Sequence, residues 1–420
     1  MFSNLKQLFN RSNKDLRKRI YFTLFCLGVF AFGSTITLSY WPNLKNSFEA
    51  LDFLQIFNLM SGGGLEKFSI FALGVSPYIT ASIITQLLQM DVIPYFKELK
   101  EQGYTGKQKI NRITRYIGVL FGFVQGYIFT VMYSGSNDIL LILKSTLVIT
   151  AGTCLLLWIG DQITKKGIGN GLSLLIMAGI IQSMPDIFTK AYTELTKLGD
   201  GALGIAIFAS FVIVYLLIIV GMVWIQLAER RIPIQYANRT NSAYGKNQNF
   251  LPIRINSAGV IPVIFASTLI AIPVTIINVI NNPSAVEFSN KYLQTNTAVG
   301  FLIYVLLIMF FGYFYTFLQM NPEEMSKNLR KSGAYIPGVR PGNDTIDYIS
   351  NVLGKLTIVG SIFLVIIAGL PILFSTFTGL DQSITIGGTG LLIVVGVAIE
   401  TYKQLESSLI SRSHRAGIKR

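Results

Sequence analysis

Ten long apolar runs limit what this chain can fold into more than any other feature. Each is about 20 residues long, the length that an α-helix needs to cross a hydrocarbon core of about 30 Å. Only 13% of the residues are charged, against about a quarter in soluble domains, which excludes a soluble globular protein. The expected membrane spans are 20–40, 74–91, 112–133, 139–160, 168–185, 203–227, 255–280, 299–319, 352–374 and 387–404.

The positions of lysine and arginine predict the orientation of these spans. With the N-terminus inside, the segments expected in the cytoplasm hold 29 of the 35 basic residues, an asymmetry typical of inner-membrane proteins. We therefore expect both termini in the cytoplasm, and the net charge of +14 requires no nucleic-acid ligand. The expected cytoplasmic segments are the tail before residue 20, 92–115, 161–167, 228–254, 320–355 and the tail after residue 400.

The first apolar run follows a basic stretch, as the apolar region of a signal peptide does. It is long and lacks a small-x-small cleavage site, so we expect a retained first helix. Cys26 and Cys154 both lie inside apolar runs, and we expect no disulfide between them. The external loop 186–202 separates five spans from five. It is a candidate seam between an N-terminal half, residues 1–185, and a C-terminal half, residues 203–420.

Residues 61–88 contain an interrupted apolar stretch. They begin with glycines at Gly62–Gly64, carry the charged residues Glu66 and Lys67, and contain Pro77. A helix built only to span lipid would avoid all of these features. The part before residue 74 is too short and too rich in glycine to span alone, so we expect it to be re-entrant or buried among other helices.

The expected spans carry no groups suited to catalysis or ion coupling. All 21 acidic residues fall in loops, at helix ends or in the interrupted segment, and the one histidine, His414, lies in the C-terminal tail. Ionisable groups near mid-membrane usually mark coupled transport. The sequence therefore argues against an enzyme or a pump, and it predicts no cofactor and no metal. Uncharged polar residues in the spans fit both close helix packing and the lining of a wet path.

Six stretches of the sequence stand out together: SGGGLEKFSIFALGVSPYITASIITQLL (61–88), DQITKKGIGNGLSLLIMAGI (161–180), AERRIPIQYANR (228–239), LPIRINSAGVIPVIFAS (251–267), YIPGVRPG (335–342) and GGTGLLIVV (387–395). Together, and in this order, they resemble the SecY family of protein-conducting channel subunits, in which the external loop 186–202 would be a hinge. The resemblance implies an all-α membrane protein with ten transmembrane helices in two five-helix halves around an hourglass pore. It also implies a re-entrant plug helix and a lateral opening between the second and seventh spans.

The resemblance also implies a constriction ring and a plug. A collar of branched apolar side chains excludes ions because it dewets, and residues four apart in a helix share one face. The plug is expected as a short helix over 65–73, beneath the ring, with its charged residues toward the wet outer side. The implied ring residues are Ile79, Ile83, Leu172, Ile176, Ile264 and Ile393. The implied plug residues are Gly62, Gly63, Gly64, Leu65, Glu66, Lys67 and Phe68.

A lateral gate and docking sites complete the implied sites. The gate would lie between helices 74–91 and 255–280, with Gln86 and Asn256 in its polar seam. Proline and glycine in YIPGVRPG predict a tight turn that presents Arg340. The residues expected to dock the SecA motor or the ribosome are Arg230, Arg231, Arg239 and Arg340. For the two arginines near residue 230, anchoring at lipid headgroups stays an alternative.

The resemblance implies the pore subunit of a channel that moves secretory proteins across the bacterial plasma membrane and inserts membrane proteins into it. The expected partners are the small membrane subunits SecE and SecG, the SecA ATPase, the ribosome through its RNA, signal peptides, unfolded preproteins and the lipid bilayer. A secondary transporter of small solutes with broken helices is an alternative. A membrane insertase or scaffold without a pore is another.

Overall fold

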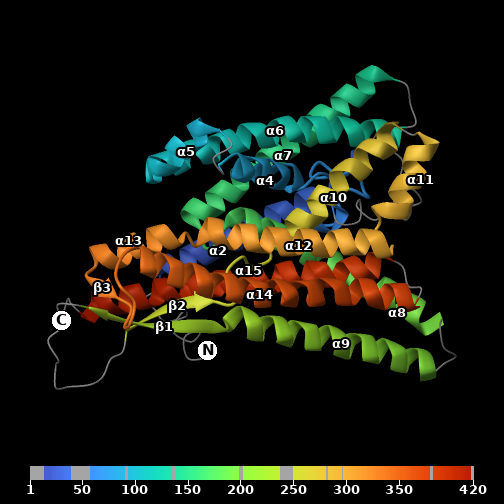
Figure 1. Cartoon of the computed structure of the whole chain (residues 1–420). Helices are drawn as coiled ribbons and strands as arrows, with labels where there is room; N and C mark the ends of the chain where they lie inside the picture. Colours follow the sequence, from blue (N-terminus) through green and yellow to red (C-terminus); the bar gives the residue numbers. More distant parts are fainter. Residues whose placement is uncertain are drawn as a thin grey trace. The chain divides into compact units, whose positions relative to one another are not determined.

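Long α-helices make up most of the chain in the computed structural model (Figure 1). The structure describes residues 14–38, 57–89, 93–134, 138–197, 202–236, 249–280, 282–295, 297–378 and 382–417. The helices are α2 (Lys14–Thr35), α4 (Ser76–Leu88), α5 (Pro94–Glu101), α6 (Tyr104–Ser134), α7 (Ile139–Lys166), α8 (Gly171–Lys197), α9 (Ala202–Leu227), α10 (Ile261–Ile280), α11 (Pro283–Tyr292), α12 (Ala298–Gln319), α13 (Pro322–Lys331), α14 (Asn343–Thr378) and α15 (Gln382–Gly417).

Each of the ten expected spans overlaps one of these helices, namely α2, α4, α6, α7, α8, α9, α10, α12, α14 and α15. Among the described residues, five helices are long and apolar enough to cross a bilayer by themselves: α7, α8, α9, α12 and α14. Helix α4 is shorter than expected, with 13 residues where a span over 74–91 was predicted. Its second residue is Pro77, which lacks an N–H and fits the first turn of a helix.

The chain divides into two compact units. The first comprises Met1–Phe208, Thr275–Asn282 and Leu380–Arg420, and the second comprises Ala209–Val274 and Pro283–Gly379. In the first unit, α6 packs against α4 and α7, and α8 packs against α7 and α15. In the second unit, α12 and α14 lie side by side (Figure 1). The expected external loop 186–202 is helical up to Lys197, where α8 ends. Its role as a hinge and the two five-helix halves stay predictions.

A three-stranded antiparallel sheet lies in the second unit, in segments that the sequence suggested were only loops. The order of its strands is β2 (Asn249–Arg254), β1 (Glu229–Tyr236) and β3 (Ala334–Tyr335). Arg230 pairs with Ile253, and Gln235 pairs with Tyr335. The sheet therefore joins two loops of the second unit that are distant in sequence.

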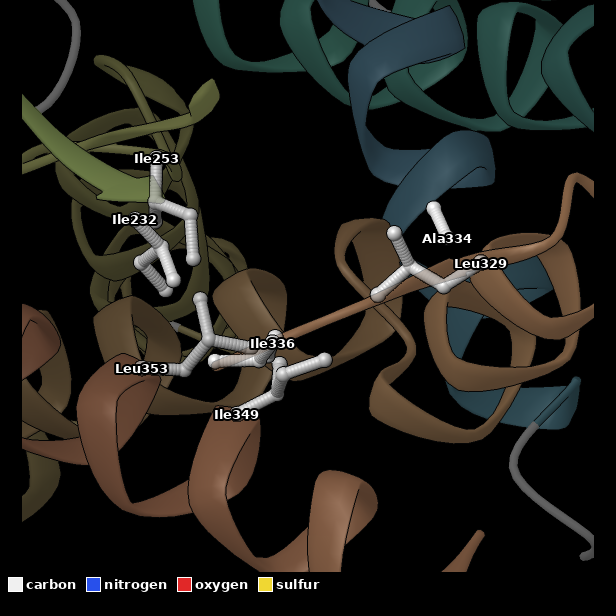
Figure 2. Packing of buried hydrophobic residues seen from close by; sticks show 7 residues of the cluster. All are labelled: Ile232, Ile253, Leu329, Ala334, Ile336, Ile349 and Leu353. Carbon is white, nitrogen blue, oxygen red and sulfur yellow. The ribbon is translucent and has the colours of Figure 1, made fainter. Parts of the chain in front are cut away.

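One hydrophobic cluster holds this sheet to the helices beside it (Figure 2). Strands β1 and β2 supply Ile232 and Ile253, which are 2% and 0% exposed. Figure 2 shows these two side chains directed toward Ile336, Ile349 and Leu353. Leu329 of α13 and Ala334 of β3 complete the buried set. Burial of such aliphatic side chains contributes about 1.5–3 kcal/mol each, so the two long loops fold as one body.

Candidate functional site

The plug segment is built from turns. Residues 61–75 form consecutive turns with one isolated bridge, so the expected helix over 65–73 is wrong. Gly62 and Gly63 have positive φ angles of 71° and 75°, a conformation that suits glycine and breaks a helix. Further along, the Ile70 N–H donates to Ile36 O at 3.1 Å, and the Leu38 N–H donates to Phe68 O at 3.1 Å. These backbone groups are therefore unavailable for helical hydrogen bonds.

Asn58 fixes the start of the plug. Its side-chain oxygen accepts a hydrogen bond from the Glu66 N–H at 3.0 Å, and its Nδ2 donates to Glu66 Oε2 at 3.2 Å. Ser61 Oγ accepts from the Leu65 N–H at 3.1 Å. Glu66 is half-buried and Lys67 is exposed, while Leu65 is buried. The two charged plug residues thus lie at its accessible side, whereas its apolar residues face the protein.

Four helices of the first unit each present a glycine to the plug. Gly33 of α2 lies under the ring of Phe71, and Gly126 of α6 lies beside Leu73. The other two glycines contact plug backbone. Gly152 of α7 lies against the carbonyl of Ile70, and Gly179 of α8 lies against the carbonyl of Met60. The sequence alone does not reveal these glycines as contact points, because their neighbours are distant in sequence.

Two of the predicted ring residues lie on one face of α4. Pro77, Tyr78 and Ala81 face Gly122 and Gly118 of α6. At 100° per residue, Ile79 and Ile83 therefore lie on the opposite face of α4. Both are nonetheless buried, with exposed fractions of 8% and 4%.

Two further ring residues lie at one level of the adjacent helices α8 and α15. Gly169 lies beside Thr401, and Ile180 lies beside Gly390, so the two helices run antiparallel with matching intervals of 11 residues. This register places Ile176 level with Ile393 to within one residue. Both side chains are buried, with exposed fractions of 7% and 6%. The plug meets α8 at Gly179, one helical turn beyond Ile176.

The other two ring candidates lie in less constrained places. Leu172 is half-buried in the first turn of α8, and its Cδ2 atom lies beside Gly160 of α7, where an added Cβ would be 2.6 Å away. Ile264 is half-buried on α10, in the part of that helix that belongs to the second unit. The ring role of all six residues stays a prediction.

The two gate candidates form hydrogen bonds within their own segments. Gln86 lies on α4 in the first unit, and its Nε2 donates to Ser82 Oγ at 3.1 Å. Asn256 lies in a turn that precedes α10, although the expected span included it. Its Nδ2 donates to Gly259 O at 3.0 Å, and Gly259 has a φ of 65°, so Asn256 stabilises this turn.

The docking candidates lie on the sheet and on a turn beside it. Arg230 and Arg231 are exposed on β1. Arg239 lies outside the described residues. The Val339 N–H donates to Ile336 O at 3.1 Å, and Gly338 has a φ of 82°, which defines a type II turn with proline and glycine at its centre. The predicted tight turn before the exposed Arg340 is confirmed.

The chain is similar along its length to SecY proteins. The SecY family model matches residues 69–402. The protein translocase subunit SecY of Bacillus subtilis (strain 168) is 45% identical over 420 residues, which cover 96% of this chain and 97% of that protein. The same subunit of Staphylococcus aureus (strain NCTC 8325 / PS 47) is 41% identical over 417 residues, covering 96% of each chain.

Solved structures show the same fold at lower sequence identity. A protein-conducting channel matches with a TM-score of 0.69 at 20% identity, covering 96% of this chain and 94% of that one. Sec61 in the canine ribosome–channel complex matches with a TM-score of 0.64 at 20% identity and the same coverage. The chain therefore belongs to the SecY family, and it is a multi-pass membrane protein and a protein-conducting channel subunit of a translocase, not an enzyme.

Proposed function

We propose that this chain moves secretory proteins across a bacterial plasma membrane and inserts membrane proteins into it, through a pore closed by an apolar ring and a plug. One observation carries this proposal. Ile176 and Ile393 are buried at one level of adjacent helices, and the plug backbone meets α8 one turn beyond that level. A narrow apolar collar of this kind blocks hydrated ions and still yields to a passing chain.

The test is to make the collar polar. In proteoliposomes, Ile176→Asn and Ile83→Asn should each let the resting channel conduct ions, because an amide hydrates a constriction that is otherwise dry. Cells that carry these variants should also export proteins with defective signal sequences. Ion current across a planar bilayer and export of a reporter with a crippled signal sequence measure the two effects.

Ile181→Asn is the matched control. Ile181 lies on the same helix as Ile176 but is 49% exposed, so its replacement tests the same change of chemistry away from the proposed ring. A leak of equal size in this control, or no leak from the two ring variants, would contradict the proposal.

The gate is proposed at α4 and α10. Gln86 supports it because its Oε1 is buried without a hydrogen-bond partner within the described part of the chain, which leaves a polar atom available to an arriving signal sequence. Asn256 stands at the base of α10. A hydrogen bond inside a membrane is worth about 0.6–2 kcal/mol, weak enough for a signal sequence to compete. Crosslinking from Gln86→Cys to an arrested signal peptide tests this placement.

The proposed partners are the SecA motor or the ribosome on the cytoplasmic side, and small SecE-like and SecG-like subunits in the membrane. The hydrophobic cluster beneath β1 supports docking of the cytoplasmic partners on this sheet, because it anchors the strand on which Arg230 and Arg231 are exposed. Arg340 follows a tight turn whose Ile336 belongs to the same core. Purification from native membranes without these small subunits would count against the membrane partners.

A further inference from the structure

The plug carries two local features that favour its release. Phe68 has a φ of 49°, and this left-handed conformation is unfavourable for a residue with a bulky side chain. Ser69 is 0% exposed, and within the described residues its Oγ has no hydrogen-bond partner. Local geometry therefore works against the seated plug, so its packing against the surrounding helices has to hold it.

That packing depends on two glycines which the plug backbone approaches closely. A Cβ added at Gly152 would lie 3.0 Å from the Ile70 carbonyl carbon and closer still to its oxygen. A Cβ added at Gly179 would lie 2.9 Å from the Met60 carbonyl carbon and 3.1 Å from the Gly62 nitrogen. Backbone atoms cannot rotate away as a side chain can, so the plug itself would have to move.

We infer that Gly152 and Gly179 are positioning residues for the closed channel: they form a backbone-to-backbone seat that holds the plug. The inference rests on the proposed function only in taking this segment to be the seal. Two helix positions outside both the ring and the plug would then determine how firmly the plug stays seated in the closed channel. Side-chain volume at these positions then sets the balance between the seated and the released plug.

A third glycine supplies a matched control. Gly126 of α6 also faces the plug, but a Cβ there would meet Leu73 Cδ1, Thr146 Cγ2 and Thr150 Oγ1 at 3.6 Å, which is ordinary van der Waals contact. Alanine is a better helix former than glycine, so the same substitution weakens none of the three helices through propensity. The three variants therefore differ in one respect, the space available beside the plug.

The experiment measures the plug directly. In the full-length chain with Cys26→Ala and Cys154→Ala, Ser69→Cys reports release, because this position is fully buried when the plug is seated. Membrane vesicles are treated with a membrane-impermeant maleimide from the outer side. Gly152→Ala and Gly179→Ala should raise the labelling rate about tenfold or more, the scale expected from overpacking a tight contact. Gly126→Ala should change the labelling rate by less than about twofold, since its Cβ makes only ordinary van der Waals contacts.

Three results would overturn the inference. The first is unchanged labelling in the Gly152→Ala and Gly179→Ala variants, and the second is an equal rise with Gly126→Ala. The third is parallel labelling of a Leu195→Cys reporter, which is fully buried on α8 and reports opening of the whole helix bundle. Ion conductance separates this inference from the proposed function. Faster labelling without a leak would support the glycine seat and refute the plug as the seal.

Discussion

Phe68 shows two opposed effects at a single residue. Its backbone is in the left-handed region, which costs about 1–2 kcal/mol for a residue with a side chain. Its side chain is only 2% exposed, and truncating a buried phenylalanine typically costs about 3–5 kcal/mol. Burial exceeds strain, so the residue stabilises the seated plug even though its conformation is unfavourable.

This balance predicts the outcome of removing the side chain. Phe68→Gly relieves the backbone strain but loses the larger stabilisation from burial of the side chain. The free-energy balance should therefore shift toward the released plug by about 2 kcal/mol. Labelling of Ser69→Cys and resting ion current should both rise. Phe68→Leu keeps an apolar side chain and should have the smaller effect, while Lys67→Gly, at an exposed neighbour, serves as the control. A Phe68→Gly plug that seats more firmly would show that strain outweighs burial.

The elements differ in how far local sequence reveals them. The helices were predictable because a membrane requires long apolar runs with satisfied backbone groups, and each expected span overlaps one. Strand β1 was harder to predict, because polar and apolar residues alternate only within the short stretch ERRIPIQY. Its pairing with β3 is also non-local, as the Tyr335–Gln235 hydrogen bond at 3.0 Å illustrates. The helix expected in the plug does not form for the same reason, because the plug backbone forms hydrogen bonds with Ile36 and Leu38, which are distant in sequence. Only the tertiary structure could reveal those contacts.

The hydrophobic core beneath the sheet should matter for docking and not for gating. Ile253 is 0% exposed, and Ile253→Ala should cost about 2–5 kcal/mol within this core. The sheet would then loosen, and trypsin should cleave faster at Arg230 and Arg231. Motor-driven transport of a preprotein should fall, while resting ion conductance stays low.

Phe250 provides the control for that prediction. It lies on the same strand, three residues away, but is 42% exposed, so Phe250→Ala removes more atoms while opening no buried cavity. If Phe250→Ala impaired transport as strongly as Ile253→Ala, the effect would belong to the exposed surface of β2 and not to the core.

At the scale of the whole molecule, the number of crossings decides on which side each docking surface lies. Within the described part of the chain, five helices are apolar and long enough to span alone, whereas ten overlap the spans expected from sequence. The other five include α4, which has only 13 residues. If all ten helices cross, the number of crossings that follow α5 is even, so α5 and the C-terminus lie on the same side of the membrane. If only the five cross, that number is odd, and the two lie on opposite sides.

Single cysteines in the chain with Cys26→Ala and Cys154→Ala test this parity. Lys109→Cys on α6 and Ser408→Cys on α15 are exposed positions that ten spans place together in the cytoplasm, whereas five spans would put them on opposite sides. Lys291→Cys on α11 lies outside under both counts and serves as the positive control. In intact spheroplasts, a membrane-impermeant maleimide should label only Lys291→Cys, and permeabilisation should expose the other two. Labelling of Ser408→Cys in intact spheroplasts would refute the even count. It would also place the C-terminus, contrary to the charge asymmetry of 29 basic residues among 35, on the outer face.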